Sequence, residues 1–432
     1  MKALLATTAA LAALSTLPAP ALAADQCDRV ASPGSDTARQ LLDSLQPGET
    51  GCLHGGTYRS FGDNVLHPRR GGEPGAPLML RSYPGERARL VGIVDIPHGS
   101  DYITLSGLDI EGTGEDGANT IKVYMRGFVL EQSDITNAWR GRSCLILGNN
   151  EGGGQAVAPI VRGNTFHECG NPENGNQDHG IYAANVLDGE IVDNLFYNSA
   201  AYAIQLYPNA QRTRFAHNVV DGSGSSERGG IVFGGDGRFA SGDNLVERNV
   251  IAYAAMAAIA SYWEGPVGTG NLARDNCVWG SRDDDIAGEW GFTAVANRVA
   301  NPLFAGRGAR DYRLAPGSRC LRTVGYDTLA RRLGALPVRK SFRAPLRIVA
   351  RPPRVSAHRV RLEFRLRGVR AGTARVMIRR HGRERVRTLH VRAKRRVLVR
   401  PLLRRGSYRA WAQVHDTSRH RSARSKRVSF RV

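Results

Sequence analysis

A polar loop that ends in Asp178-His179 and continues into an apolar strand with Tyr182 holds residue types that could do chemistry. Imidazole accepts a proton near neutral pH, and a phenol can donate one to a leaving oxygen. Removing a proton from a carbon next to a carboxylate also needs a cation to stabilise the enolate-like charge, and Lys122 could supply it. We therefore predict a catalytic group of His179, Asp178, Tyr182 and Lys122, in which Asp178 orients the imidazole. The alternative for His179 is a hydrogen-bonded residue at the start of a strand.

Short strand-like segments position these residues. They align on an inward apolar column: Ile121, Leu145, Ile181, Ile204, Ile231 and Ile259. The following positions then face outward on one side of a sheet. Exposed aromatic rings on a rigid sheet are suited to binding sugar rings. The predicted substrate-binding residues of this face are Tyr124, Gln205, Tyr207, Tyr262 and Trp263. The alternative is that some of these rings pack beneath loops.

A second set of segments repeats one motif, an apolar stretch followed by Asp or Asn, at steps of 24 to 31 residues. The marked residues are Asp109, Asp134, Asn164, Asn194, Asn218, Asn249 and Asn276. No helix-length apolar period separates the segments, which disfavours a parallel sheet joined by helices. Short strands in coils of roughly 25 residues predict an all-β fold, a right-handed parallel β-helix that forms a single-stranded solenoid. Stacked amides satisfy backbone groups, so we expect the five asparagines to be structural.

The cysteines and the N-terminus are typical of an exported protein. The steps from Cys27 to Cys52 and from Cys144 to Cys169 are both 25 residues, which is one coil. Residues one coil apart lie within disulfide reach, and the third pair follows by elimination. The predicted disulfides are Cys27–Cys52, Cys144–Cys169 and Cys277–Cys320. A charged start, an apolar run and an Ala-x-Ala site at 21–23 predict a signal peptide over residues 1–23 and a secreted, extracellular location, which could include the cell wall.

Residues near the N-terminus carry a family resemblance. The segment "GSDTARQLLDSL" (34–45) has N-capping residues and helical spacing, and this helix would cover the first open rung of a solenoid. The following "QPGETGCLHGGTYRS" (46–60) resembles the entry to the pectate-lyase-like β-helix superfamily. The resemblance covers roughly residues 25–325 and implies the fold, whereas lyases, epimerases, glycosidases and non-enzymes all share it. We expect the β-helix to span residues 24–325.

The Asp178-His179 pair is also similar to the Asp-(x)-His motif of uronate epimerases and lyases on this fold. In those enzymes the motif works with Tyr and with Lys or Arg on a carbon next to a carboxylate. The proline of the Asp-Pro-His form found in the epimerases is absent here. The resemblance therefore implies uronate chemistry without selecting epimerisation.

The charge of the chain is concentrated at its C-terminal end. Residues 340–432 contain 30 Lys and Arg but 3 Asp and Glu, a net charge of +27, whereas residues 1–339 have a net charge of −6. Alternating segments such as "HRVRLEFRLRG" predict a small β-sandwich, and "GSYRAWAQVHDTSRHRS" resembles the immunoglobulin-like modules of secreted bacterial proteins. We expect a linker over 326–345 and a basic immunoglobulin-like β-sandwich over 346–432. Its arginines form either a solvated face or a tether to an anionic cell-surface polymer.

Together these features predict a secreted carbohydrate-active β-helix protein, first of all a polysaccharide lyase or related uronate-acting enzyme on acidic polysaccharide. The alternatives are a non-catalytic glycan-binding or cell-surface solenoid and, more weakly, a glycoside hydrolase. The sequence requires no cofactor, although Ca²⁺ could replace the lysine, and it identifies no metal ligands. No run of residues after the N-terminus is apolar and long enough to span a membrane, and export favours an acidic glycan over nucleic acid as the partner.

Overall fold

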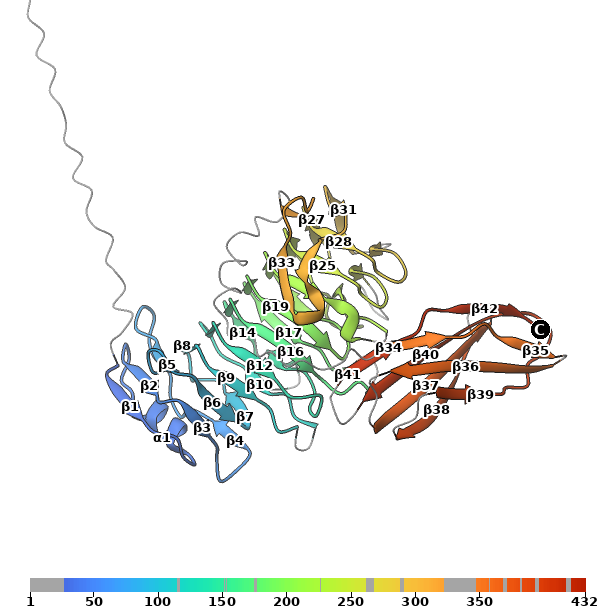
Figure 1. Ribbon diagram of the computed structural model, residues 1–432. Helices are drawn as coiled ribbons and strands as arrows, with labels where there is room; N and C mark the ends of the chain where they lie inside the picture. Colours follow the sequence, from blue (N-terminus) through green and yellow to red (C-terminus); the bar gives the residue numbers. More distant parts are fainter. Residues whose placement is uncertain are drawn as a thin grey trace, which may run out of the picture.

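The structure, a computed structural model, describes most of the chain between Cys27 and Val432. The described residues are 27–114, 117–150, 152, 154–174, 177–225, 227–261, 268–287, 291–321, 347–356, 358–367, 371–380, 383–392, 396–416 and 421–432. They form a parallel β-helix followed by a two-stranded antiparallel hairpin and two larger antiparallel sheets, which confirms the predicted all-β solenoid with a smaller β-sandwich (Figure 1). The predicted signal peptide (1–23) and linker (326–345) lie outside the described residues.

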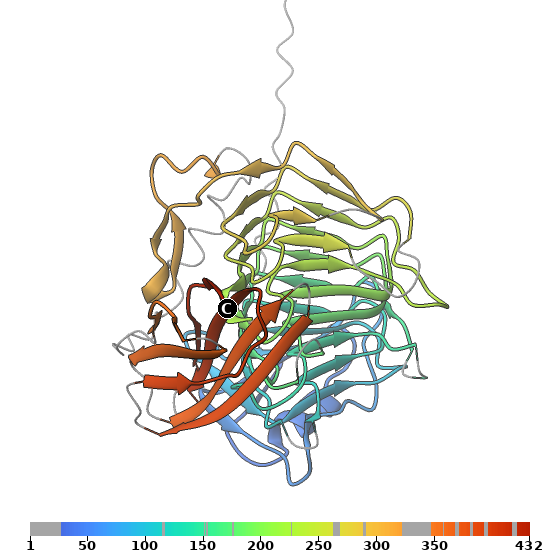
Figure 2. The same ribbon diagram turned by 90° about the vertical axis from the view of Figure 1, so that its right-hand side faces the viewer.

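Three parallel sheets, which we name sheets I, II and III, form the walls of the β-helix, and their strands stack coil upon coil (Figure 2). Within the described ranges, sheet I contains β1 (Arg29–Ala31), β2 (Thr50–Leu53), β5 (Leu78–Ser82), β8 (Ile103–Ser106), β11 (Val129–Glu131), β15 (Ile160–Arg162), β18 (Glu190–Val192), β21 (Arg214–Ala216), β24 (Leu245–Glu247), β27 (Leu272–Arg274) and β30 (Thr293–Val295). Sheet II contains β4 (Asn64–Leu66), β7 (Ile93–Ile96), β10 (Ile121–Val123), β13 (Leu145–Leu147), β14 (Ala156–Val157), β17 (Ile181–Leu187), β20 (Ile204–Gln211), β23 (Ile231–Phe233), β26 (Ile259–Ser261) and β29 (Ile286–Ala287). Sheet III contains β3 (Gly56–Tyr58), β6 (Ala88–Val91), β9 (Asp109–Glu111), β12 (Asp134–Thr136), β16 (Thr165–Cys169), β19 (Leu195–Ser199), β22 (Val219–Asp221), β25 (Val250–Ala252), β28 (Cys277–Trp279) and β31 (Arg298–Val299).

Apolar columns fill the interior. Alternate residues of a strand point to opposite faces, and neighbouring strands lie about 4.8 Å apart, so one inward apolar residue per coil builds a continuous core. The predicted inward column of sheet II is confirmed, because its residues pair in register and are fully buried: Ile121, Leu145, Ile181, Ile204, Ile231 and Ile259. The outward position that follows this column is therefore also placed as predicted.

A buried ladder of asparagines joins the coils at the turn between sheets I and III. The side-chain N–H of each asparagine donates to the amide oxygen of the next at 2.8–3.0 Å, through Asn164, Asn194, Asn218, Asn249, Asn276 and Asn297. The predicted structural role is confirmed. The alignment of Asp109 and Asp134 with this column is wrong by one residue, because Ser133 takes the ladder position and Asp134 pairs with Thr165. Both aspartates therefore belong to sheet III and face outward.

The N-terminal end of the solenoid is covered as predicted. Helix α1 (Thr37–Ser44) buries Leu41 and Leu42, and a side-chain carbon of Leu41 lies 3.0 Å from the position that a Cβ on Gly51 would take. The absence of a side chain at Gly51 lets the helix pack directly on β2. The predicted disulfides are also present, with Cα–Cα distances of 5.6, 5.3 and 5.5 Å: Cys27–Cys52, Cys144–Cys169 and Cys277–Cys320.

A hairpin and the β-sandwich complete the chain. Strands β32 (Phe304–Gly306) and β33 (Asp311–Leu314) pair with each other, and short 3₁₀ turns are η2 (Gly222–Gly224) and η3 (Arg307–Ala309). Among the described residues, the sandwich contains β34 (Arg347–Ala350), β35 (Arg354–Ser356), β36 (Arg359–Arg367), β37 (Ala371–Arg380), β38 (Arg383–Arg392), β39 (Arg396–Val399), β40 (Ser407–Asp416), β41 (Arg421–Arg424) and β42 (Val428–Arg431). None of the helices in the described residues is long and apolar enough to cross a bilayer.

Candidate functional site

The outer face of sheet II carries two of the predicted aromatic residues, Tyr182 and Tyr207. Lys122 pairs with Ile146, Ile146 with Tyr182 and Tyr182 with Gln205, so these four residues form one outward column. Tyr182 and Tyr207 are half-buried and stack with ring centroids 6.5 Å apart and planes 15° from parallel. Gln205, which pairs in register with Tyr182, is 6% exposed and is therefore buried rather than at the surface. The face therefore presents ring edges and faces that are partly open to solvent.

The other predicted members of this face are more scattered. Tyr124 is half-buried, and burial together with the charge of Asp95 raises its phenol pKa to about 12. Lys122 lies two strands from Tyr182, about 10 Å by the spacing of parallel strands, and pairs in register with Asp95 on β7. Tyr262 and Trp263 lie outside the described residues. The structure thus brings Tyr182, Gln205 and Tyr207 together and leaves Lys122 apart from them.

A row of side-chain amides continues the face beyond the tyrosines. Asn209 donates to Asn185 at 3.1 Å, and Gln155 donates to the same Asn185 oxygen at 3.1 Å. Gln211 donates to Asn209 at 3.1 Å, and Asn150 donates to the Ala184 carbonyl at 3.2 Å. All of these amide residues are half-buried, so each is partly open to solvent. An amide offers both donors and acceptors, which is what a row of sugar hydroxyls requires.

Local backbone features explain how the amide row forms. The pairing of β17 with β20 shifts register after Ala183, so that Asn185 rather than Val186 lies opposite Asn209. The loop that supplies Asn150 begins at Gly148, whose φ is 70° and where a Cβ would lie 1.9 Å from the Asn185 carbonyl oxygen. Only glycine permits that approach. Sequence reasoning missed this row, although the 24-residue step from Asn185 to Asn209 is visible in the sequence.

His179, the predicted base, is enclosed by the protein. The residue is 1% exposed, its ring lies 5.5 Å edge-on from that of Tyr182, and Tyr202 lies on another side at 5.8 Å. Its backbone N–H donates to the Ser143 hydroxyl at 3.0 Å, and its Nδ1 accepts from the Tyr202 backbone N–H at 3.4 Å. Burial lowers the imidazole pKa to about 3, although a hydrogen bond with Gln205 partly offsets this effect by raising the pKa. In this arrangement His179 is neutral and does not reach a ligand on the outer face.

Asp178 holds the loop that precedes it. One carboxylate oxygen accepts from the Asn171 backbone N–H at 2.9 Å and from the Asn174 side chain at 3.0 Å. The residue is 1% exposed, and burial raises its carboxyl pKa although both of these hydrogen bonds lower it. Asp178 therefore fixes a loop, and its described hydrogen bonds do not include the imidazole of His179. The catalytic roles assigned to Asp178, His179, Tyr182 and Lys122 stay predictions.

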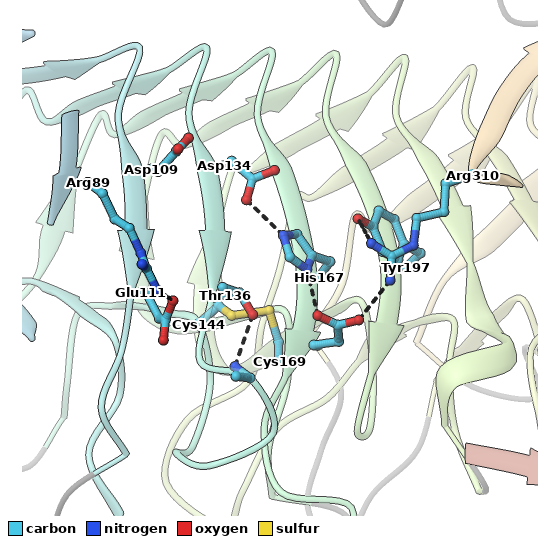
Figure 3. A network of polar contacts seen from close by, with 12 residues as sticks. Arg89, Asp109, Glu111, Asp134, Thr136, Cys144, His167, Cys169, Tyr197 and Arg310 are labelled. Atoms are coloured by element: carbon cyan, nitrogen blue, oxygen red, sulfur yellow. Dashed lines mark hydrogen bonds and ion pairs between the residues drawn. A yellow bond between two sulfur atoms is a disulfide. The ribbon is translucent and has the colours of Figure 1, made fainter. Parts of the chain in front are cut away.

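A charged cluster that sequence reasoning missed lies on the outer face of sheet III (Figure 3). The two ring nitrogens of His167 contact Asp134 at 2.7 Å and Glu168 at 3.1 Å. Arg310 donates to the other oxygen of Glu168 at 2.8 Å and to the Tyr197 hydroxyl at 3.0 Å, with its guanidinium 4.6 Å from the Tyr197 ring centroid. Figure 3 shows Asp134, His167, Tyr197 and Arg310 following one another across the sheet. These partners are up to 142 residues apart, so no local motif announces the cluster.

The electrostatics of this cluster favour a fixed imidazolium. Burial by itself lowers the pKa of His167, but Tyr197, Asp134 and Glu168 together hold it well above its ordinary value. Burial opposes the charge of Glu168, yet His167 and Arg310 lower its pKa to about 2. Both ring nitrogens of His167 are already bonded, so the ring is placed to hold its neighbours rather than to exchange protons with a ligand.

The cluster fastens the β32–β33 hairpin onto sheet III. Arg307 donates to both carboxylate oxygens of Asp221 at 2.7 and 2.8 Å, and Tyr312 donates to the same carboxylate at 2.9 Å. The hairpin covers an apolar half of the sheet whose buried residues include Leu195, Tyr197, Val219, Val250 and Cys277. This face is therefore largely occupied by the protein itself, and sheet II offers the better site for a ligand.

Metal ligands are not evident in the described part of the chain. There, no group of three or more His, Cys, Asp or Glu side chains is arranged to hold a metal ion. Calcium binding stays a prediction.

Comparison with known proteins finds similarity only among solved structures. No family model matches the sequence, and no curated protein matches it significantly. An alginate lyase from Paenibacillus sp. str. FPU-7 is 13% identical with a TM-score of 0.38, covering 63% of this chain and 99% of its own. A mannuronic acid specific family 6 lyase from human gut microbiota is 18% identical with a TM-score of 0.34, covering 62% and 67%. The periplasmic alginate epimerase AlgG is 13% identical with a TM-score of 0.25, covering 62% and 54%. Similarities this weak carry no information about function, which therefore rests on the side chains of this chain.

Proposed function

We propose that this chain is a polysaccharide-binding β-helix protein that holds an acidic glycan along the outer face of sheet II. The observation that carries the proposal is the combination, on β17 and β20, of the Tyr182–Tyr207 stack with the Asn185–Asn209 amide pair. Aromatic rings cover the apolar faces of sugars, and amides pair with their hydroxyls. Both strands are fixed in a long parallel sheet, so these side chains lose little conformational entropy when a glycan binds.

The preference for an acidic glycan comes from Lys122. It is the only lysine between residues 3 and 339, and it lies in the same outward column as Tyr182. A glycan chain lying across the strands could contact both residues, since their strands are about 10 Å apart.

A lyase is the second candidate. The observation that favours it is the edge-on contact of His179 with Tyr182 at 5.5 Å, which keeps a base next to an acid. His179 would first have to reach the outer face, whereas binding uses side chains that are already there. Glycan binding is therefore the first candidate function, and turnover is measured in the same samples.

Titration calorimetry with acidic and neutral polysaccharides tests the proposal, with absorbance of the double bond formed by β-elimination recorded in parallel. Tyr207→Ala should weaken binding of the acidic glycan about 10-fold, because an aromatic contact contributes roughly 1.4 kcal/mol. Tyr83→Ala is the matched control, because Tyr83 is also half-buried but stacks on His54 away from sheet II. Equal affinities of both variants and of the unchanged protein would contradict the proposal, and β-elimination would favour the lyase.

A further inference from the structure

The β-sandwich contains a cavity whose lining is dominated by arginines. Its volume is about 440 Å³, and the lining includes Arg354, Arg359, Arg361 and Arg400 together with Val355 and Leu402. Arg354 and Arg359 are exposed, and Arg361 is half-buried. A hollow lined by several guanidinium groups differs from an evenly charged surface, because it directs those groups at one small volume.

The strand register explains why the arginines converge. Strand β35 pairs antiparallel to β36 with Arg354 opposite Arg361 and Ser356 opposite Arg359. Val360, between the two β36 arginines, is 1% exposed and points into the sandwich core, so Arg359 and Arg361 share the opposite face. Arg400 arrives from the segment after β39, where the Val360 backbone N–H donates to the Pro401 carbonyl at 3.1 Å. The positions of Arg354, Arg359 and Arg361 are therefore set by paired strands.

The positive charges of the cavity are poorly balanced by the protein. Arg361 lies 3.6 Å from Glu363, whereas in the described ranges no carboxylate lies within ion-pairing distance of Arg354, Arg359 or Arg400. Like charges held together repel one another, and an anion would relieve that repulsion. The arrangement therefore requires either solvent ions or a ligand with negative groups.

The lining also indicates the class of anion. Guanidinium groups bind carboxylate, sulfate or phosphate through two parallel hydrogen bonds. Val355 and Leu402 are 40% and 70% exposed and offer apolar contact beside these groups. No aromatic ring is among the described lining residues, so stacking of nucleic acid bases is not offered. An acidic sugar, with a carboxylate on a ring that has apolar faces, matches both parts of the lining.

We propose that this cavity is a second glycan site, which binds the carboxylate groups of an acidic polysaccharide independently of sheet II. The anion site itself rests on the geometry of the sandwich. The choice of polysaccharide over nucleic acid rests on the proposed function and on the three disulfides, which are typical of an oxidising, extracellular compartment. Two sites on one chain would raise the apparent affinity for a long polymer far above that for a short one.

Titration of the full chain with a short uronate oligosaccharide at low salt tests this proposal. The measurement is made in the Tyr207→Ala background, so that a failure of the sheet II site does not affect it. Arg359→Gln combined with Arg400→Gln should weaken binding at least 10-fold. The matched control, Arg385→Gln combined with Arg387→Gln, removes the same charge from exposed positions on β38 and should change affinity less than 2-fold. If the double variant does not fold, Arg354→Gln provides the same comparison.

Three outcomes would overturn the proposal. Equal losses in the cavity and control variants would mean that long-range attraction, and not the cavity, binds the polymer. If duplex DNA binds at least 10-fold more tightly than the oligosaccharide, and the cavity variants remove that binding, the ligand is nucleic acid instead. Binding that is lost with Tyr207→Ala alone, but is unaffected by the arginine changes, would leave sheet II as the glycan site and exclude the cavity.

Discussion

Replacement of His179 by glutamine should remove an acid-sensitive contribution to the stability of the β-helix. His179 is 1% exposed and packs against Tyr182 and Tyr202, and burial lowers its pKa to about 3. A histidine that stays neutral in the folded state but accepts a proton in the unfolded state opposes folding as the pH falls. The contribution of neutral His179 to the free energy of unfolding is therefore complete above pH 6.5 and is lost progressively between pH 6.5 and about 3.

The magnitude follows from the two pKa values. Each pKa unit corresponds to about 1.4 kcal/mol, so the unchanged protein should lose about 5 kcal/mol through this one group when the pH reaches 3. Between pH 6.5 and 4.5 the loss should be about 3 kcal/mol. Glutamine cannot titrate but can still hydrogen-bond, so His179→Gln should show a flatter pH profile while all other groups contribute equally to both proteins.

Urea unfolding at several pH values between 7 and 4.5, followed by tryptophan fluorescence with the disulfides intact, measures the difference. We expect His179→Gln to be less stable at pH 7, because a well-packed ring is lost, and to approach the unchanged protein as the pH falls. Parallel profiles would refute the reasoning, because they would mean that His179 titrates near its ordinary pKa and is reached by water. The imidazole would then be accessible as a base, and the lyase would become the better candidate.

Two further predictions concern the hairpin on sheet III. Glu168→Gln should destabilise the protein at pH 7, because the ionised carboxylate of Glu168, whose pKa is lowered to about 2, contributes stability only while it is charged. The loss of stability should become smaller as the pH falls from 4.5 toward 2. Thermal unfolding at several pH values measures it, and a variant that is still less stable than the unchanged protein at pH 2 would contradict the prediction. Replacing Cys277 and Cys320 by serine should lower the free energy of unfolding by about 4 kcal/mol, because the disulfide closes a loop of 43 residues. The change should also increase hydrogen exchange in β32 and β33. Unchanged exchange would show that the ion pairs of Arg307 and Arg310 hold the hairpin alone.

Features that repeat from coil to coil were predictable from the sequence. The inward column of sheet II, from Ile121 to Ile259, follows from matching apolar segments, and the pairings Cys27–Cys52 and Cys144–Cys169 follow from the same period. The asparagine ladder was predictable for the same reason. The prediction that Asp109 and Asp134 belong to the same column is wrong. An apolar residue follows each Asp directly, which shifts the motif by one position.

Features that break the repeat were not predictable. The amide row depends on a register shift after Ala183 and on a loop starting at Gly148, and neither has a counterpart in neighbouring coils. The His167 cluster depends on Arg310, which returns to sheet III through a hairpin after the last coil. His179 was predicted as a catalytic base, but it is buried against Tyr202, one coil further on, whose backbone N–H donates to its Nδ1. Such contacts are set by tertiary packing rather than by local pattern.

The central claim is that a glycan lies on the outer face of sheet II, and a crystal structure of the full chain with a short acidic oligosaccharide tests it most directly. We predict sugar rings against Tyr182 and Tyr207, with hydroxyl groups hydrogen-bonded to Asn185 or Asn209. Oligosaccharide bound only in the arginine-lined cavity, or only beside His167 on sheet III, would contradict the claim, even if the affinity in solution were high.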